Sequence, residues 1–235
     1  TAGGKIEGIV DGEVVVVHTT GSQTDAGSTP NTYELDWKKA SSKNYKLKED
    51  SIGILTVTEQ TIDPGKDPDK QNPNYSGVTI NKPSNKVYDG KEHKWSPAVT
   101  DKEGNALVEG KDYEVAYSTE DFTNVTGTIT VTITGIGNYT GSHDVTYQIT
   151  KRTVKLTSGS DSKTYDGTPL VKHDATVSED GFVKDDGVTY EFTGSQTNVG
   201  TSDNTFTYTL KNGTLASNYI ITTEVGKLTV NPVTD

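Results

Sequence analysis

The sequence predicts an all-β protein built as an elongated array of tandem, small antiparallel Ig-like β-sandwich modules. Apolar and polar residues alternate along short stretches such as Tyr33–Trp37 (YELDW), which is the pattern of a strand with one buried face. Turn pairs such as Asp11-Gly12 and Asn212-Gly213 separate these stretches. No ten-residue stretch shows a helical period. The alternative is a β-grasp-like module, which requires a crossing helix that the sequence does not predict.

The strands expected from alternation, β-branched content and flanking turn residues are short and evenly spread along the chain. They are residues 14–19, 32–38, 53–58, 77–80, 113–117, 127–134, 145–150, 153–157, 188–193, 205–210, 219–223 and 227–230.

A seven-residue element recurs near the two ends of the chain. Gly21–Gly27 (GSQTDAG) returns as Gly194–Gly200 (GSQTNVG), an offset of 173 residues from position 21 to position 194. The same offset pairs Gly53–Val57 with Gly226–Val230. A chain that copies one module along its length is typical of arrays that reach or hold rather than catalyse.

The middle of the chain contains a more distant copy. Tyr88-Asp-Gly90 matches Tyr165-Asp-Gly167, and the Asn-Tyr pair at 138–139 sits where 218–219 sits in the last copy and 44–45 in the first. Likewise the Asn-Val pair at 124–125 matches 198–199. We therefore predict a partial repeat at 1–62, a Pro- and Asp-rich linker at 63–75, a divergent Ig-like repeat at 76–151 and a complete repeat at 152–235.

The first repeat lacks the residues that open the last one. At the offset of 173, Thr1 corresponds to Asp174, so the first repeat has no counterpart of residues 151–173. We expect either that the sequence is cut from a longer array or that another strand completes this repeat. A monomer is expected, with strand pairing to a neighbouring chain at the incomplete repeat, because a missing strand leaves backbone groups unpaired.

These motifs carry a family resemblance that covers nearly the whole chain. Thr193–Thr201 (TGSQTNVGT), Asn218–Ile221 (NYII) and Gly226–Val230 (GKLTV) resemble the tandem YDG/MBG-type repeats of bacterial, Gram-positive cell-surface adhesins. The middle repeat, with Tyr88–Lys91 (YDGK) and Gly137–Gly141 (GNYTG), is similar to a sister Ig-like repeat of the same proteins. The resemblance implies an extracellular segment of a cell-wall-anchored parent protein, acting as a stalk or in adhesion.

Composition narrows the classes of partner. The net charge of −11 argues against nucleic acid, whose phosphates require a basic surface. No segment approaches the roughly 18 apolar residues that would span a membrane, so we expect no membrane insertion here. There is no cysteine, so no disulfide supports the small cores, and the compartment is not fixed by cysteine usage.

Catalytic patterns are missing from the sequence. The four histidines, His18, His93, His143 and His173, are scattered over all three repeats at no metal-ligand spacing. None of the common nucleophile, zincin or phosphate-loop motifs occurs. We therefore predict a protein that is not an enzyme, with no catalytic residues and no cofactor.

Calcium is the one metal that the sequence brings into question, because its ligands are oxygen atoms. Acidic residues cluster in the linker and in one loop of the last repeat, at Asp63, Asp67, Asp69, Asp180, Asp185 and Asp186. Neither cluster has the spacing of an EF-hand, and prolines interrupt the first. Solvated acidic loops are the favoured interpretation, with calcium binding as the alternative.

Two tryptophans and one lysine complete the candidate residues. Trp37 belongs to an inward-facing series and is expected in a core. Trp95 joins no such series and is the candidate contact for a host glycan or glycoprotein, with core or edge packing as the favoured interpretation of its side chain. An isopeptide bond between Lys155 and Asn231 would staple the last repeat. The alternation of Val154 and Leu156 with Lys155 directs the lysine to water, which argues against that bond.

Overall fold

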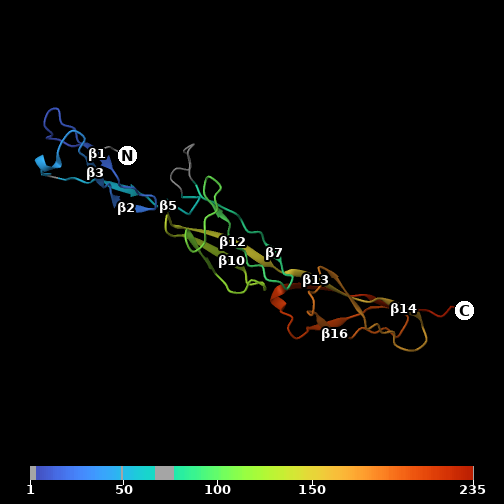
Figure 1. Cartoon of the computed structure of the whole chain (residues 1–235). Coiled ribbons are helices and arrows are strands. Elements are labelled where there is room, and N and C mark those ends of the chain that lie inside the picture. The colour runs from blue at the N-terminus through green and yellow to red at the C-terminus, as the bar shows by residue number, and fades with distance from the viewer. Residues whose placement is uncertain (1–3, 49, 67–76, 235) are drawn as a thin grey trace. The chain divides into compact units, whose positions relative to one another are not determined.

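A computed structural model of the chain describes residues 4–48, 50–66 and 77–234. It is all-β, with no α-helix among these residues, and its small sheets fit a β-sandwich-like arrangement (Figure 1). Two single-turn 3-10 helices, Ser42–Asn44 and Ala216–Asn218, directly precede Tyr45 and Tyr219. The predicted fold class is confirmed, and each stretch expected to be extended contains a strand.

The strands are short and follow the turn signals of the sequence. They are β1 (Val16–Thr19), β2 (Gly27–Pro30), β3 (Tyr33–Asp36), β4 (Ile54–Val57), β5 (Gln60–Thr61), β6 (Thr79–Ile80), β7 (Lys86–Val87), β8 (Val99–Thr100), β9 (Tyr113–Tyr117), β10 (Thr128–Gly135), β11 (Tyr139–Thr140), β12 (Ser142–Thr150), β13 (Arg152–Ser158), β14 (Asp161–Thr164), β15 (Ala175–Glu179), β16 (Val188–Phe192), β17 (Gly200–Asp203), β18 (Phe206–Leu210), β19 (Tyr219–Glu224) and β20 (Lys227–Asn231).

The chain divides into two compact units that interleave in sequence. The first holds 1–81, 97–116 and 132–144, and the second holds 82–96, 117–131 and 145–235. β5 lies on the first repeat's side of the boundary predicted at residue 62, yet it pairs in parallel with β11 of the middle repeat. The predicted domain boundaries stay a prediction, and most of the predicted linker lies outside the described residues.

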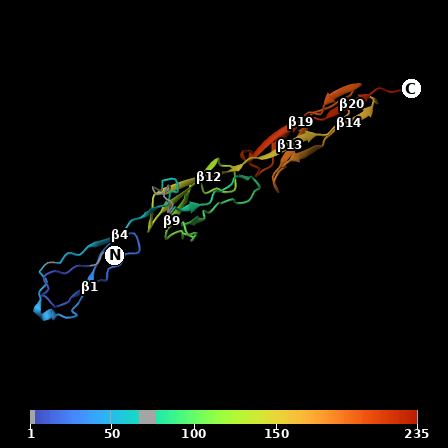
Figure 2. The same ribbon diagram turned by 90° about the horizontal axis from the view of Figure 1, so that it is seen from above.

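The last repeat has two three-stranded sheets and a two-stranded one. Their orders are β15-β13-β19, β14-β20-β17 and β16-β18, while the middle of the chain contributes the sheet β7-β12-β10-β9. β13 runs parallel to β19 and antiparallel to β15, and β20 runs parallel to β14 and antiparallel to β17. Figure 2 shows β13 beside β19 and β14 beside β20. β13 and β20, the first and last strands of the repeat, therefore each lie at the centre of a three-stranded sheet.

Alternation along these central strands builds the core. Val154 and Leu156 of β13 and Leu228 and Val230 of β20 are almost completely buried, and the threonines and charged residues between them are less so. The burial of such aliphatic side chains stabilises each by about 1.5–3 kcal/mol relative to exposure. β10 of the middle repeat follows the same rule, as its sequence predicts.

The first repeat differs in that none of its described residues from 4 to 61 is buried. Its strands β1 to β4 pair as β1-β3 and β2-β4. The prediction that Trp37 belongs to a core is wrong: the side chain is half-buried and packs against Tyr45, with ring centroids 5.6 Å apart.

Candidate interaction sites

An asparagine bridge joins successive repeats at two places in the chain. Asn138 accepts a hydrogen bond from the amide of Ala26 at 2.6 Å and donates one to the Asp25 carboxylate at 2.9 Å. Asn218 accepts from the amide of Val125 at 2.9 Å and donates to the Asn124 side chain at 2.8 Å. Both ends of each side-chain amide are therefore used, which fixes its orientation.

The same bridge arises from the same sequence elements. Asp25-Ala26 and Asn124-Val125 occupy matching places in the first and middle repeats, and Asn138 and Asn218 each precede a tyrosine that begins a strand. Sequence comparison aligned these pairs without indicating that one member binds the other. Local sequence patterns could not indicate these contacts, because the bonded residues are 112 and 93 positions apart along the chain.

Each tyrosine after the 3-10 turn is clamped through its hydroxyl. Tyr219 donates to Asp186 and accepts from the amide of Val183 at 3.2 Å. Burial and the bond to Asp186 raise the pKa of Tyr219 well above the ordinary tyrosine value. In the first repeat the Tyr45 hydroxyl contacts Glu13 and the amide of Val10 in the same way.

A second tyrosine strengthens the contact between the middle and last repeats. Tyr88 of the Tyr-Asp-Gly turn packs edge-on against Tyr219, with ring centroids 5.5 Å apart, and its hydroxyl lies 3.4 Å from the Asp186 carboxylate. Tyr88 is 7% exposed, whereas the matching Tyr165 of the last repeat is 42% exposed. The tyrosine of the Tyr-Asp-Gly turn is thus a packing residue in the middle repeat, and its counterpart in the last repeat is exposed.

Trp95, the candidate glycan contact, is half-buried. Its backbone amide donates to the Tyr147 hydroxyl at 3.3 Å, and its carbonyl accepts from the Tyr117 hydroxyl at 3.0 Å. Beside it Lys94 lies over the rings of Tyr117 and Phe122, at 4.6 and 5.3 Å from their centroids. These three side chains line a shallow hollow of about 450 Å³ that Trp95 itself does not line.

The four histidines occupy separate places. His18 faces Asp36 at 3.7 Å, His93 bonds to Asp89 at 2.8 Å, and His143 bonds to Asp63 at 3.0 Å. The fourth, His173, stacks on Phe192. Each contact is of a kind found in ordinary structural packing, and among the described residues none of these histidines belongs to a group of three or more His, Cys, Asp or Glu side chains that could hold a metal ion.

The acidic residues considered for calcium are spread over different partners. The Asp63 carboxylate is largely buried; burial opposes ionisation, but the Gly65 amide and His143 together hold its pKa below the ordinary value. Asp180 accepts from the amide and hydroxyl of Thr153, and that hydroxyl bond chiefly lowers its pKa. Asp186 bonds to Tyr219.

The remaining acidic residues considered for calcium are Asp185, Asp67 and Asp69. Asp185 is exposed on a left-handed turn, with φ of 72°. Asp67 and Asp69 lie outside the described residues. Within the described parts of the chain, no group of three or more His, Cys, Asp or Glu side chains is arranged to hold a metal ion.

Lys155 lies on the outer face of β13, as the alternation predicts. It pairs with Glu224 of β19 at 2.5 Å and its side chain is 38% exposed. Asn231, at the end of β20, is exposed and lies in the other three-stranded sheet. The placement of both residues gives no support to an isopeptide bond between them, which requires a lysine buried beside its partner.

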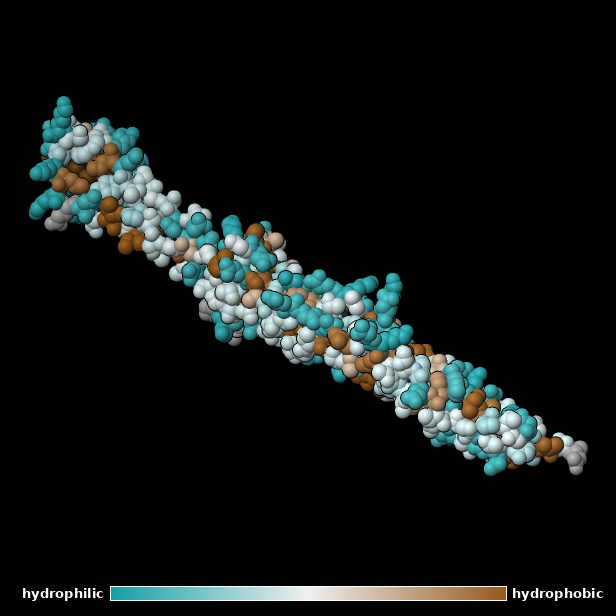
Figure 3. Space-filling model, turned by 90° about the horizontal axis from the view of Figure 1, so that it is seen from below, coloured by the Kyte–Doolittle hydropathy of each residue, from teal (hydrophilic) through white to brown (hydrophobic). Residues whose placement is uncertain are grey.

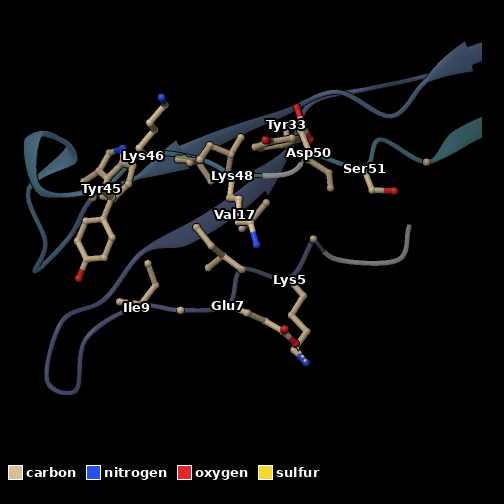
Figure 4. Close-up of a pocket in the computed structure, with 18 of the residues that line it drawn as sticks. Lys5, Glu7, Ile9, Val17, Tyr33, Tyr45, Lys46, Lys48, Asp50 and Ser51 are labelled. Carbon is tan, nitrogen blue, oxygen red and sulfur yellow. Dashed lines mark ion pairs between the residues drawn. The ribbon is translucent and has the colours of Figure 1, made fainter.

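A groove of about 960 Å³ lies in the first repeat. Lys5, Glu7 and Ile9 line one side of it and Lys46, Lys48, Asp50 and Ser51 line the other, with Val17 between them (Figure 4). Trp37 also lines the groove. Figure 3 shows hydrophobic residues gathered on the surface of this part of the molecule.

Comparison with known families identifies one part of the chain. Residues 150–226 match the sequence model of the YDG domain. This stretch holds β13 to β19 and includes the Tyr-Asp-Gly turn, the repeated Gly194–Gly200 element and the Asn-Tyr pair. No curated protein matches the chain. Among the described residues, no helix has the length and hydropathy that crossing a bilayer requires.

Proposed function

We propose that this chain is a non-catalytic stalk or spacer segment of a bacterial cell-surface adhesin, held outside the cell by a cell-wall-anchored parent protein. The observation that carries the proposal is the asparagine bridge, which occurs twice with the same geometry at Asn138 and Asn218. A spacer needs each repeat to be fixed to the next. A side-chain amide that makes two hydrogen bonds to the neighbouring repeat does this better than a flexible linker.

Further support comes from the sheets of the last repeat. β14 and β20 run parallel, so tension that draws β14 toward its N-terminus and β20 toward its C-terminus slides the two strands past each other. All of their hydrogen bonds then bear the load together. This arrangement suits a segment under tension, as a spacer between a cell and its target would be.

The bridge can be tested by a distance measurement. We expect spin labels at K91C and E191C, in a chain that has no other cysteine, to give a narrow distance distribution that broadens in N218A. The matched control is N44A, because Asn44 is the counterpart in the first repeat and is exposed. A broad distribution in wild type would contradict a fixed joint, and equal breadth in wild type, N218A and N44A would contradict the role of Asn218 in fixing it.

The location is tested separately. Antibodies raised against the chain should label intact cells of the source bacterium, and deletion of these residues from the parent should shorten the reach of its adhesive end. Labelling only after cell lysis would overturn the surface assignment.

The second candidate function is a host glycan- or glycoprotein-binding module, favoured by the hollow of Lys94, Tyr117 and Phe122 beside Trp95. Aromatic faces next to charged groups are typical of sugar contacts. A glycan array with wild type and W95A distinguishes the two: binding lost in W95A supports the module, and no binding in either supports the spacer. Calcium is an alternative ligand for the acidic loops alone. We expect added calcium to leave the melting temperature of the chain unchanged.

A further inference from the structure

The two asparagine bridges use acceptors of different chemistry. Asn138 donates its side-chain amide to the carboxylate of Asp25, which offers an oxygen in either orientation. Asn218 donates to Asn124 at 2.8 Å, and an asparagine side chain accepts only through its Oδ1. If the Asn124 amide were reversed, its Nδ2 would face the Nδ2 of Asn218, and two donors would meet. The second bridge therefore requires a group that sets the orientation of Asn124.

The carboxylate of Asp121 is placed to set that orientation. Its Oδ2 accepts a hydrogen bond from Nδ2 of Asn124 at 2.9 Å, which directs Oδ1 of Asn124 to Asn218. Its Oδ1 accepts from the backbone amides of Thr123 and Asn124 at 2.9 and 3.0 Å, so the carboxylate is itself fixed. An ionised carboxylate has no donor, and it can therefore bind only the Nδ2 end of Asn124.

The charge state of Asp121 agrees with this role. The backbone amide of Asn124, followed by the side chain of Asn124 and the backbone amide of Thr123, lowers the pKa of Asp121 below its ordinary value. Asp121 is therefore ionised at neutral pH, in the form that only accepts hydrogen bonds.

A continuous set of hydrogen bonds links Asp121 to the buried side of the joint. Asn124 binds Asp121 with one end of its amide and Asn218 with the other. Asn218 in turn accepts from the backbone amide of Val125 at 2.9 Å. Because Asn218 is 0% exposed, water does not replace a lost partner, and a buried amide group left unpaired is destabilising.

The residue three positions before the acceptor differs between the first and middle repeats. Ser22 precedes Asp25, whereas Asp121 precedes Asn124. An aspartate acceptor needs no group to orient it, and a second carboxylate beside it would repel it. Each of these two repeats thus has one carboxylate at the bridge, either at the acceptor itself or three positions before it.

We propose that Asp121 is the positioning residue of the bridge at Asn218, because it orients the Asn124 amide so that the middle repeat accepts the asparagine of the last repeat. The role rests on the proposed spacer function, in which Asn218 fixes one repeat to the next. Asp121 also determines specificity: an acceptor asparagine that no carboxylate orients presents a donor as readily as an acceptor.

The test exchanges the two side chains of the middle repeat. D121N keeps an oxygen for the backbone amides of Thr123 and Asn124, but it places an Nδ2 group opposite Asn124 and so favours the reversed amide. In D121N/N124D, the introduced asparagine donates to the introduced aspartate, which accepts from Asn218 as Asp25 accepts from Asn138. The double variant has the same composition and net charge as wild type.

The amide hydrogen exchange of Val125, measured by NMR on the full chain, reports on the bridge because this amide binds Asn218. We expect D121N to speed that exchange by roughly tenfold, the factor that corresponds to the loss of one hydrogen bond. D121N should also broaden the distance distribution between spin labels at K91C and E191C. D121N/N124D should restore both measurements to the wild-type result.

The matched control is D203N, which removes an exposed carboxylate on β17 and should change neither measurement. Far-ultraviolet circular dichroism checks that all variants stay folded. Unchanged exchange of Val125 in D121N overturns the proposal. Exchange as fast in D121N/N124D as in D121N also overturns it, because Asp121 would then act only on its own loop. A broad label distribution in wild type would contradict the spacer function alone, and the exchange of Val125 would still decide the role of Asp121.

Discussion

Gly194 and Gly21, the first residues of the repeated element, are required by a close backbone approach. A Cβ atom on Gly194 would lie 2.6 Å from the Cα of Asn204, and one on Gly21 would lie 2.6 Å from the Cα of Asn31. Two residues further on, Gln196 donates to the carbonyl of Asn198 at 2.7 Å and holds the loop that follows. The recurrence of the glycine thus has a steric origin, and the recurrence of the glutamine has a role in a hydrogen bond.

We expect G194A to lower the free energy of unfolding by at least about 1–3 kcal/mol, because a methyl group cannot be accommodated against backbone. Urea denaturation followed by Tyr fluorescence measures this. G53A is the control: a Cβ there meets nothing within 4 Å, so its stability should change by less than about 0.5 kcal/mol. Equal losses in the two variants would show that the close approach is unimportant.

Tyr219 predicts how stability responds to alkaline pH. Its pKa is raised by burial first and then by its bond to Asp186, so the folded state favours the neutral phenol. That contribution is complete below the ordinary value of 10.0 and is lost as the pH rises from there toward the raised value. We expect the melting temperature to fall above pH 10.0 in wild type and to fall less steeply in Y219F. Parallel pH profiles would contradict this.

At the scale of elements, the central strands of the last repeat explain what the sequence predicted and what it missed. β13 and β20 show the alternation of Val154, Leu156, Leu228 and Val230, and both were predicted. β14 (DSKT) and β17 (GTSD), which flank β20, are polar and were missed. Such edge strands form because a central strand supplies their hydrogen-bonding partners, which local composition does not reveal.

The burial of β13 gives a direct prediction. L156A should destabilise the last repeat by about 2–5 kcal/mol, since Leu156 is 0% exposed and its removal leaves a cavity. The control on the same strand is K155A, which removes only a surface pair with Glu224 and should cost less than about 1 kcal/mol. Thermal unfolding of the full chain measures both, and a smaller loss for L156A than for K155A would refute the assignment of this core.

For the whole molecule, the important contrast is between a repeat with a core and one without. The alternation around Trp37 could be predicted, and Trp37 directly follows strand β3, but the pattern does not reveal how far its side chain is buried, and Trp37 is only half-buried. The asparagine bridges could not be predicted, because Asn138 and Asn218 contact residues far away along the chain.

This contrast predicts a gradient of local stability. Amides of β1 to β4 should exchange with solvent at a low free energy of opening, while those of β13 and β20 should approach the global value. Hydrogen exchange read out by mass spectrometry on the full chain measures both sets at once. Similar protection in β3 and β13 would mean that the first repeat holds together by contacts other than buried apolar ones.

The central position of β20 also constrains how the last repeat is made. A polypeptide leaves the ribosome, or an export channel, with its N-terminus first. β14 and β17 are both released before β20, the strand that joins them, and each β14 residue precedes its partner in β20 by 67 residues. Until Lys227–Asn231 emerge, the sheet β14-β20-β17 cannot close. Such late closure leaves β14 and β17 without their central partner until the synthesis of the repeat is nearly complete.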